Sequence, residues 1–327
     1  MKTSSRLIQL FTAVLLFLFT LATSSTTFSA APSATFTVNA SFDAIDANPG
    51  DGICAVTANL GSACTLRAAV EEANLNVGAD IINLPSAVYL LTIAGGEQTN
   101  FPNVRLNDLD LTDAAGVTIN GNGSTIIHTA VPNAFNASTA VFELAIDAVA
   151  VIDNIIIENS AQGYRNNQGT LTITNGVVRN GRASTSGTTF DSSAILSTGD
   201  LTVDNFTVSN MPPAANVFGG TITARGQGTT INLSNVHITN PGDMGMSLGG
   251  NNNSATLTNS SVDGSDESGL MITSGQVTIV NSTFSNNALG GLEVFHITTF
   301  GSAPNIDISN STISGNTGRG GVHFSMG

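Results

Sequence analysis

Two side chains near the carboxyl end of the chain have the types that acid–base chemistry requires. Glu293 lies in the segment GGLEVF, where Leu292 and Val294 should face inward and the carboxylate outward. His323 lies in the related segment GGVHF and faces outward by the same count. If these segments are neighbouring strands, the two side chains lie about 5 Å apart. Glu293 and His323 are therefore the candidate catalytic pair, and the alternative is two solvated side chains on a strand face.

A second group of carboxylates lies near the amino end, in the loop FDAIDANPGDG. Asp43, Asp46 and Asp51 are closely spaced among glycine and proline, which is a pattern that can bind Ca²⁺. Their spacing is not that of an EF-hand. The alternative is a solvated acidic turn whose carboxylates accept local backbone hydrogen bonds. No metal or other cofactor is assigned from the sequence.

A repeat must position these side chains. Seven copies of a short alternating segment align on the asparagines Asn154, Asn175, Asn205, Asn235, Asn259, Asn281 and Asn310. The positions four and two before each asparagine, and three after it, are apolar in every copy. Alternation over four or five residues is typical of strands. Asparagine tolerates the left-handed backbone of a sharp corner, and stacked asparagines can form a ladder of hydrogen bonds. We expect these asparagines to be buried in the stack.

A third strand follows most of these corners, led by small residues as in GGTITA from Gly219 and GLMIT from Gly269. One repeat is thus three short strands and three turns, and such strands bury a face only by stacking coil on coil. The coils would lie about 4.8 Å apart. The sequence predicts an all-β, right-handed parallel β-helix with three-strand coils over residues 92–327.

The amino-terminal segment points to an exported protein. Lys2 and Arg6 precede the apolar run LIQLFTAVLLFLFTLA and then small residues, which is typical of a secretory signal peptide over residues 1–30. The alternative is an uncleaved anchor helix, for which the run is short. We expect no membrane span after cleavage, and a secreted or cell-surface location. Without those two cations the net charge changes from −14 to −16, which argues against nucleic acid as a partner.

Residues 35–91 follow a different pattern: strand, acidic loop, helix, strand. Over Thr65–Asn76, Thr65 is a plausible N-cap and Leu66, Ala69, Val70 and Ala73 share one helical face. A solenoid end needs a cover, and this helix is the candidate. Cys54 and Cys64 are the only cysteines, and export favours a disulfide between them over two thiols.

The run CTLRAAVEEAN at 64–74 resembles the CSLREA-type region, which is named after its Cys-Ser-Leu-Arg-Glu-Ala motif and introduces secreted bacterial β-helix proteins of pectin-lyase-like architecture. Threonine replaces the serine at Thr65 and keeps the cap, whereas Ala68 replaces the glutamate. The resemblance implies an extracellular or surface location more firmly than a reaction. Motifs of pectin-degrading β-helix enzymes, such as Asn-Thr-Asp or Gly-His-Gly, are absent from the sequence.

Two functions remain open at this point. The first is a non-catalytic β-helix module for adhesion, or for binding an extracellular glycan or surface protein. The second is a polysaccharide lyase or glycoside hydrolase acting on the strands led by glycine. The segment from Gly320 to Gly327 begins a strand and stops, so we expect further coils or an anchoring domain beyond it.

Overall fold

Alternation of apolar and polar residues produces long parallel sheets in the computed structural model. The structure describes residues 33–56, 63–93, 108–129, 140–182, 193–213, 220–296 and 303–326, which belong to one compact unit from Pro32 to Gly327. The predicted signal peptide lies outside the described residues. Among the described helices, none has the length and hydropathy that a membrane crossing requires.

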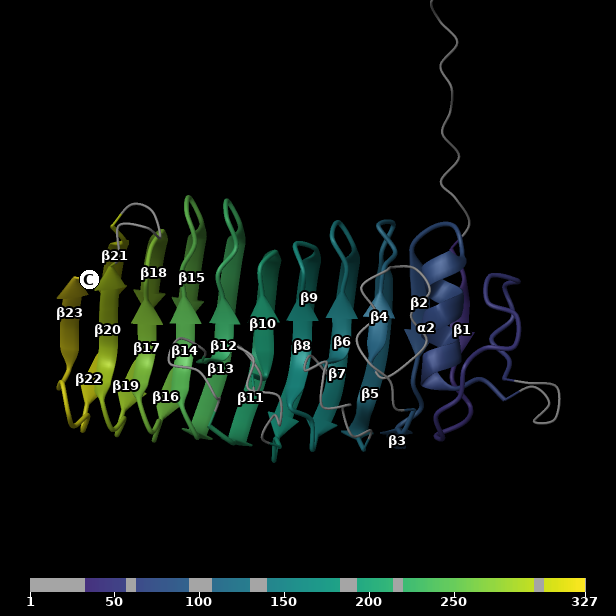
Figure 1. Cartoon of the computed structure of the whole chain (residues 1–327), viewed down its shortest axis with the longest axis horizontal. Coiled ribbons are helices and arrows are strands. Elements are labelled where there is room, and N and C mark those ends of the chain that lie inside the picture. Colours follow the sequence, from purple (N-terminus) through teal and green to yellow (C-terminus); the bar gives the residue numbers. More distant parts are fainter. Residues whose placement is uncertain are drawn as a thin grey trace, which may run out of the picture. The chain divides into compact units, whose positions relative to one another are not determined.

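The first sheet has 14 strands, and its main path contains one strand from each successive coil (Figure 1). Every strand pair in it is parallel. The path is β1 (Thr35–Thr37), β2 (Asp80–Asn83), β5 (Val117–His128), β7 (Val149–Glu158), β9 (Thr170–Arg179), β11 (Asp200–Met211), β13 (Thr230–Pro241), β15 (Ser254–Thr258), β18 (Gln276–Val280) and β21 (Asn305–Ser309). Beside it lie β3 (Val88–Leu91), β16 (Ser261–Asp263), β19 (Thr283–Ser285) and β22 (Thr312–Ser314).

The second sheet has nine strands, again parallel and in chain order. They are β4 (Leu109–Leu111), β6 (Ala140–Leu144), β8 (Gln162–Asn166), β10 (Ile195–Ser197), β12 (Gly220–Ala224), β14 (Met244–Leu248), β17 (Ser268–Ile272), β20 (Gly290–His296) and β23 (Val322–Met326). The last six contain the predicted third strands, five of them led by glycine and β10 by Ser-Ser-Ala, whereas β4, β6 and β8 were not anticipated. In β6, β12, β14 and β17 every residue is buried, so both faces of this sheet are covered there.

The apolar columns of the repeat form the core. All 18 column positions in the first six copies are buried, among them Ile152, Val208 and Phe284. In the last copy Ile306 and Ile313 are only partly buried and Ile308 is 40% exposed. Aromatic rings fill part of the interior, where Phe142 and Tyr164 stack with ring centroids 5.8 Å apart. The core thus runs continuously through the coils and opens at the last one.

The corner asparagines adopt the expected backbone but not the expected burial. All seven have positive φ, from 49° to 54°, and some bond along the stack, as where Asn205 Nδ2 donates to Asn175 Oδ1 at 2.8 Å. Six are exposed and Asn235 is half-buried, so the prediction of a buried ladder is wrong. The left-handed corner turns these side chains outward and the following residue inward. In the last coils that residue is serine, and Ser260 N donates to Ser282 Oγ at 3.2 Å inside the corner.

Helix α2 (Leu66–Leu75) packs against β1, β2 and β4, at the end of the row opposite β21 and β23 (Figure 1). Thr65 is its N-cap: the hydroxyl accepts a hydrogen bond from Ala68 N at 3.1 Å and donates to Ala44 O at 2.6 Å. Leu66 and Val70 enter the hydrophobic core. The helix therefore covers apolar side chains of the first coils, which is the geometry of a solenoid cap.

Candidate functional site

The predicted Glu293–His323 pair exists as lateral neighbours, because β20 and β23 pair in the register Glu293 to His323. Glu293 is not the solvated carboxylate that strand alternation suggests. It is 5% exposed, accepts a hydrogen bond from Ser268 Oγ at 3.0 Å, and forms an ion pair with Arg319. The expectation of an open acid–base pair is therefore corrected to a buried carboxylate neutralised by arginine. Arg319 lies in the turn before β23, and the alternation of strand residues does not predict the direction of side chains in turns.

More carboxylates lie near this ion pair. Burial raises the pKa of Glu267, and the charge of the neighbouring Asp243 raises that pKa further, together with a hydrogen bond between the two carboxyl groups. The charge of Glu293 also raises the pKa of Glu267, whereas the charge of Arg319 lowers it. Asp243, Glu267, Glu293 and Arg319 come from four successive coils, so only stacking brings them together. The group contains a carboxyl that retains its proton to higher pH than usual, which is a property of a general acid.

The three aspartates of the acidic loop do not converge on one point. Asp43 forms a buried ion pair with Arg67, with Nε 2.7 Å from Oδ1, and its Oδ2 accepts hydrogen bonds from the backbone N–H groups of residues 92 and 93. Asp46 is buried and accepts from Asn48 N and Ala55 N, both at 2.8 Å. Asp51 accepts from Ile53 N at 2.9 Å. These bonds favour the alternative of an acidic turn held by local hydrogen bonds over a Ca²⁺ site.

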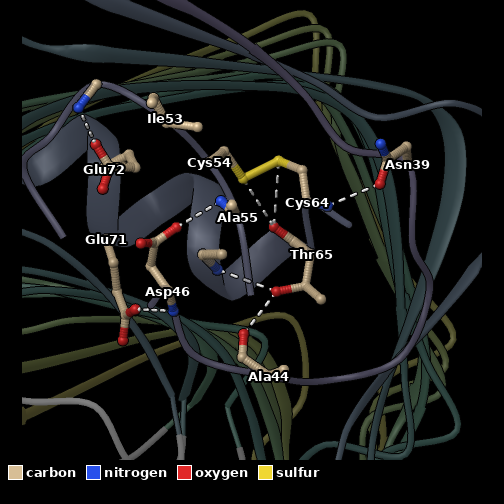
Figure 2. The surroundings of a disulfide bond; sticks show 12 residues. Asn39, Ala44, Asp46, Ile53, Cys54, Ala55, Cys64, Thr65, Glu71 and Glu72 are labelled. Atoms are coloured by element: carbon tan, nitrogen blue, oxygen red, sulfur yellow. Dashed lines mark hydrogen bonds between the residues drawn. A yellow bond between two sulfur atoms is a disulfide. The ribbon is translucent and has the colours of Figure 1, made fainter. Parts of the chain in front are cut away.

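The disulfide between Cys54 and Cys64 is confirmed, with a Cα–Cα distance of 5.1 Å. It lies directly above the N-cap of α2, and both sulfurs face the carbonyl oxygen of Thr65 (Figure 2). The helix holds the loop on its other side as well, because Glu71 accepts from Asp46 N at 2.6 Å (Figure 2). The disulfide and these bonds act as structural ties.

A cluster of three carboxylate side chains, which the sequence did not indicate, lies on the first coils of the second sheet. One ligand oxygen of each of Asp108, Asp110 and Glu143 lies within 4.8 Å of the others, and all three side chains are buried. Burial, followed by the charges of Asp110 and Glu143, raises the pKa of Asp108 well above its ordinary value. Glu143 is balanced by Arg165, whose Nε lies 3.7 Å from Oε1. These three carboxyl groups can share a proton or bind a hard cation. The repeat does not predict the cluster, because Asp108 and Asp110 precede the aligned copies.

A polar groove lies at the corner between the second and first sheets. Its volume is about 650 Å³. We call it the corner groove, and its lining residues come from the turns of four successive coils: Asp147, Gln168, Gly169, Thr170, Thr198, Gly199, Asp200, Arg225, Gly226, Gln227, Gly228 and Thr229. Sequence alternation did not predict it, because turns interrupt the strand period.

Glycines make the floor of the corner groove. A Cβ on Gly199 would lie 2.2 Å from the carbonyl oxygen of Gly169, and one on Gly226 would lie 2.4 Å from the carbonyl oxygen of Thr198. Only residues without a side chain therefore fit where these turns stack, and the surface is hollow there. The side chains of Asp147, Gln168, Thr198, Asp200 and Gln227 are exposed around this floor.

Arg225 gives the corner groove its positive charge. Its Nε donates to Ser247 Oγ of β14 at 3.1 Å, which holds the guanidinium against that strand. Burial lowers the pKa of Arg225 to about 10, so the side chain remains a cation at neutral pH. With Asp147 and Asp200 the groove contains both signs of charge among amide and hydroxyl groups. Such a lining can donate to and accept from a ligand rich in hydroxyl groups.

Comparisons with known proteins found one family model and one solved structure that are similar to the chain. Residues 165–327 match the model of the right-handed beta helix region. The A-module of mannuronan C-5 epimerase AlgE4 from Azotobacter vinelandii is similar to the chain with a TM-score of 0.34 and 12% sequence identity, over 75% of this chain and 86% of that one. No curated protein matches the sequence. The parallel register of both sheets and the family match confirm the prediction from sequence: this chain is a right-handed parallel β-helix.

Proposed function

We propose that this protein is an exported β-helix module that binds a glycan in the corner groove without cleaving it. The observation that carries the proposal is the groove itself: an open polar concavity with a backbone floor that crosses four coils. Three coil spacings of about 4.8 Å correspond to roughly 14 Å, which accommodates a short run of sugar residues lying along the helix axis. The expected export of the chain places the groove where extracellular glycans occur.

The chemistry of the walls favours a neutral or weakly charged glycan. Sugar hydroxyls can donate to the carboxylates of Asp147 and Asp200 and accept from Arg225 and the amide of Gln227. The chain has a formal net charge of −14, which opposes strongly anionic polymers. Fold alone supports no reaction, because the same architecture can bind or cleave.

Binding to a panel of purified polysaccharides, measured by calorimetry, tests the proposal. Asp147→Asn suits the left-handed backbone at this position, where φ is 62°, and Gln227→Ala shortens an exposed side chain. We expect each to weaken binding, because Asp147→Asn removes the negative charge and one of the two accepting oxygens, and Gln227→Ala removes the amide. Thr202→Ala, on the exposed face of β11, is the matched control. Binding that is absent from every polysaccharide, or unchanged in both groove variants, would refute the proposal.

Glycan cleavage at the group around Glu293 is the second candidate function. It is favoured by the raised pKa of Glu267 beside Asp243 and by the ion pair between Glu293 and Arg319. This reading predicts new reducing or unsaturated ends in the same polysaccharide panel, and their loss in Glu267→Gln and Glu293→Ala. If the wild-type protein produces no new ends, cleavage is excluded for the polysaccharides tested and the binding proposal is unaffected.

A further inference from the structure

The carboxylates of Asp108, Asp110 and Glu143, which we call the acidic triad, are brought together by the stacking of two coils. Asp108 and Asp110 are two positions apart at the amino end of β4, the spacing that places side chains on one face of a strand. Glu143 lies directly beside Asp110, because β4 and β6 pair in that register. The three residues are only 5%, 8% and 4% exposed. The carboxyl groups are thus close to one another and shielded from bulk water.

The charges in the acidic triad do not balance. Three ionised carboxyl groups carry a charge of −3, and Arg165, with Nε 3.7 Å from Glu143 Oε1, supplies +1. Arg67 also reaches the triad, but it forms its ion pair with Asp43 and donates to the backbone oxygen of Asp108. A buried charge of −2 is costly unless protons or a divalent cation compensate it. One divalent cation would balance it completely.

Glu143 has a buried oxygen that needs a positive partner. Its Oε1 accepts a hydrogen bond from Asn167 Nδ2 at 2.6 Å, whereas its Oε2 has no hydrogen-bond partner among the described residues. The carboxyl group of Glu143 also lies within hydrogen-bonding reach of that of Asp108. Ionised carboxylates accept hydrogen bonds but cannot donate them, so this contact requires a proton or a cation between the two groups.

Helix α2 fixes the backbone that carries two of these side chains. Arg67 Nη1 donates to the carbonyl oxygen of Asp108 at 2.7 Å. Asn74 Nδ2 donates to the carbonyl oxygen of Asp110, also at 2.7 Å, and Asn74 Oδ1 accepts from Thr112 N at 2.9 Å. An ion bound by the triad would therefore join β6 to a strand that the capping helix already holds.

The spacing of the oxygens suits calcium. One oxygen from each carboxyl group lies within 4.8 Å of the other two, so a point exists within about 2.8 Å of all three. Calcium binds carboxylate oxygens at about 2.3–2.6 Å, whereas magnesium requires about 2.0–2.1 Å in a near-octahedral shell. A small inward movement of the side chains is enough for calcium, and second carboxylate oxygens or water can complete its shell. Magnesium needs a larger contraction.

We propose that the acidic triad binds one Ca²⁺ ion, which fastens the first coils of the second sheet beneath the capping helix. The ion replaces the protons that the carboxyl groups would otherwise share. Because the triad is assembled only in the folded chain, Ca²⁺ binds the folded state and stabilises it.

Calorimetric titration of the chelator-treated protein with Ca²⁺, and separately with Mg²⁺, tests the proposal. We expect about one Ca²⁺ per chain, weaker binding of Mg²⁺, and a melting temperature that rises with the Ca²⁺ concentration. Asp110→Asn keeps the shape of the side chain and removes one negative charge, so it should weaken Ca²⁺ binding about tenfold or more. Asp263→Asn, which changes a half-buried carboxylate on β16, is the matched control and should bind as the wild type does.

Melting without Ca²⁺ shows whether the variant still folds. Asp110→Asn relieves repulsion within the triad, so without Ca²⁺ it should melt at or above the wild-type temperature, and Ca²⁺ should raise the melting temperature of the wild type alone. A wild-type protein that binds no Ca²⁺, or prefers Mg²⁺, overturns the proposal; so does equal affinity of Asp110→Asn and Asp263→Asn. An Asp110→Asn protein that melts well below the wild type without Ca²⁺ contradicts the charge argument. All these measurements are made without glycan, so they are independent of binding in the corner groove.

Discussion

His128, the last residue of β5, should make the fold sensitive to acid. Its side chain is fully buried, and Nδ1 lies 3.5 Å from Arg182 Nη2. The pKa of His128 is lowered from 6.5 to about 4, mainly by burial. The charges of Arg182 and Arg67 lower this pKa further, whereas the charge of Asp43 raises it. The imidazole is therefore neutral in the folded protein at pH values where the unfolded chain protonates it.

The sign and size of the effect follow from proton linkage. Between pH 6.5 and about 4 the unfolded state binds more protons than the folded state, so stability is lost as the pH falls through this window. Each pKa unit corresponds to about 1.4 kcal/mol, and the lowering of the His128 pKa therefore corresponds to roughly 3 kcal/mol. This loss should be complete at pH values below about 4.

The assay compares the wild-type protein with His128→Gln, which cannot titrate in this range. Urea unfolding gives the free energy of unfolding of each protein at several pH values, and hydrogen exchange of the amides around residue 128 reports on local opening. The difference between the two proteins isolates His128, because other titrating groups such as Asp108 contribute to both. We expect the difference to change by roughly 3 kcal/mol between pH 7 and 4, to the disadvantage of the wild type. A difference that is independent of pH would show that the reasoning is wrong.

The remaining predictions concern the cap and the groove floor. Asp43→Asn leaves the buried cation of Arg67 without a counter-charge and should lower the free energy of unfolding by about 3–5 kcal/mol; a change below about 1 kcal/mol in urea unfolding would contradict this. Reduction of the Cys54–Cys64 disulfide, which joins residues 10 apart, should lower that free energy by about 3 kcal/mol, and equal melting temperatures with and without reductant would speak against it. Gly199→Ala places a methyl group against the carbonyl oxygen of the preceding coil, so it should cost about 1–3 kcal/mol and weaken glycan binding; unfolding and calorimetry of the same sample would measure both.

The column pattern of the repeat was sufficient for most of the fold. Positions two and four before each asparagine and three after it are local information, since alternation and a repeated register suffice to define strands that stack. The structure has an eighth corner of this kind at Asn122 in β5, where φ is 51°. The repeat pattern does not reveal it, because the pairing of β5 with β7 shifts in register between Asn120 and Ser124. Strands β4, β6 and β8 lack the leading glycines of the later copies, and the pattern therefore missed them.

The candidate sites were predicted less well, because their partners come from turns. The Glu293–His323 register was correct, but the ion pair to Arg319 depends on where a turn places its side chain. The pairing of Asp43 with Arg67 joins residues 24 apart across the cap, and no local pattern indicates it. The corner groove exists because glycines of neighbouring coils stack against one another, although they are far apart in the chain.

The amino-acid sequence by itself determined the β-helix, the left-handed corners and the helix at the amino end, since each depends on residues a few positions apart and on their repetition. Only the tertiary structure decided which polar groups lie together: Glu293 with Arg319, Asp108 with Glu143, and the backbone floor of the corner groove. The physical reason is that stacking is periodic along the strands but not through the turns. Variable turns therefore decide the chemistry of this protein's surface, while uniform strands decide its architecture.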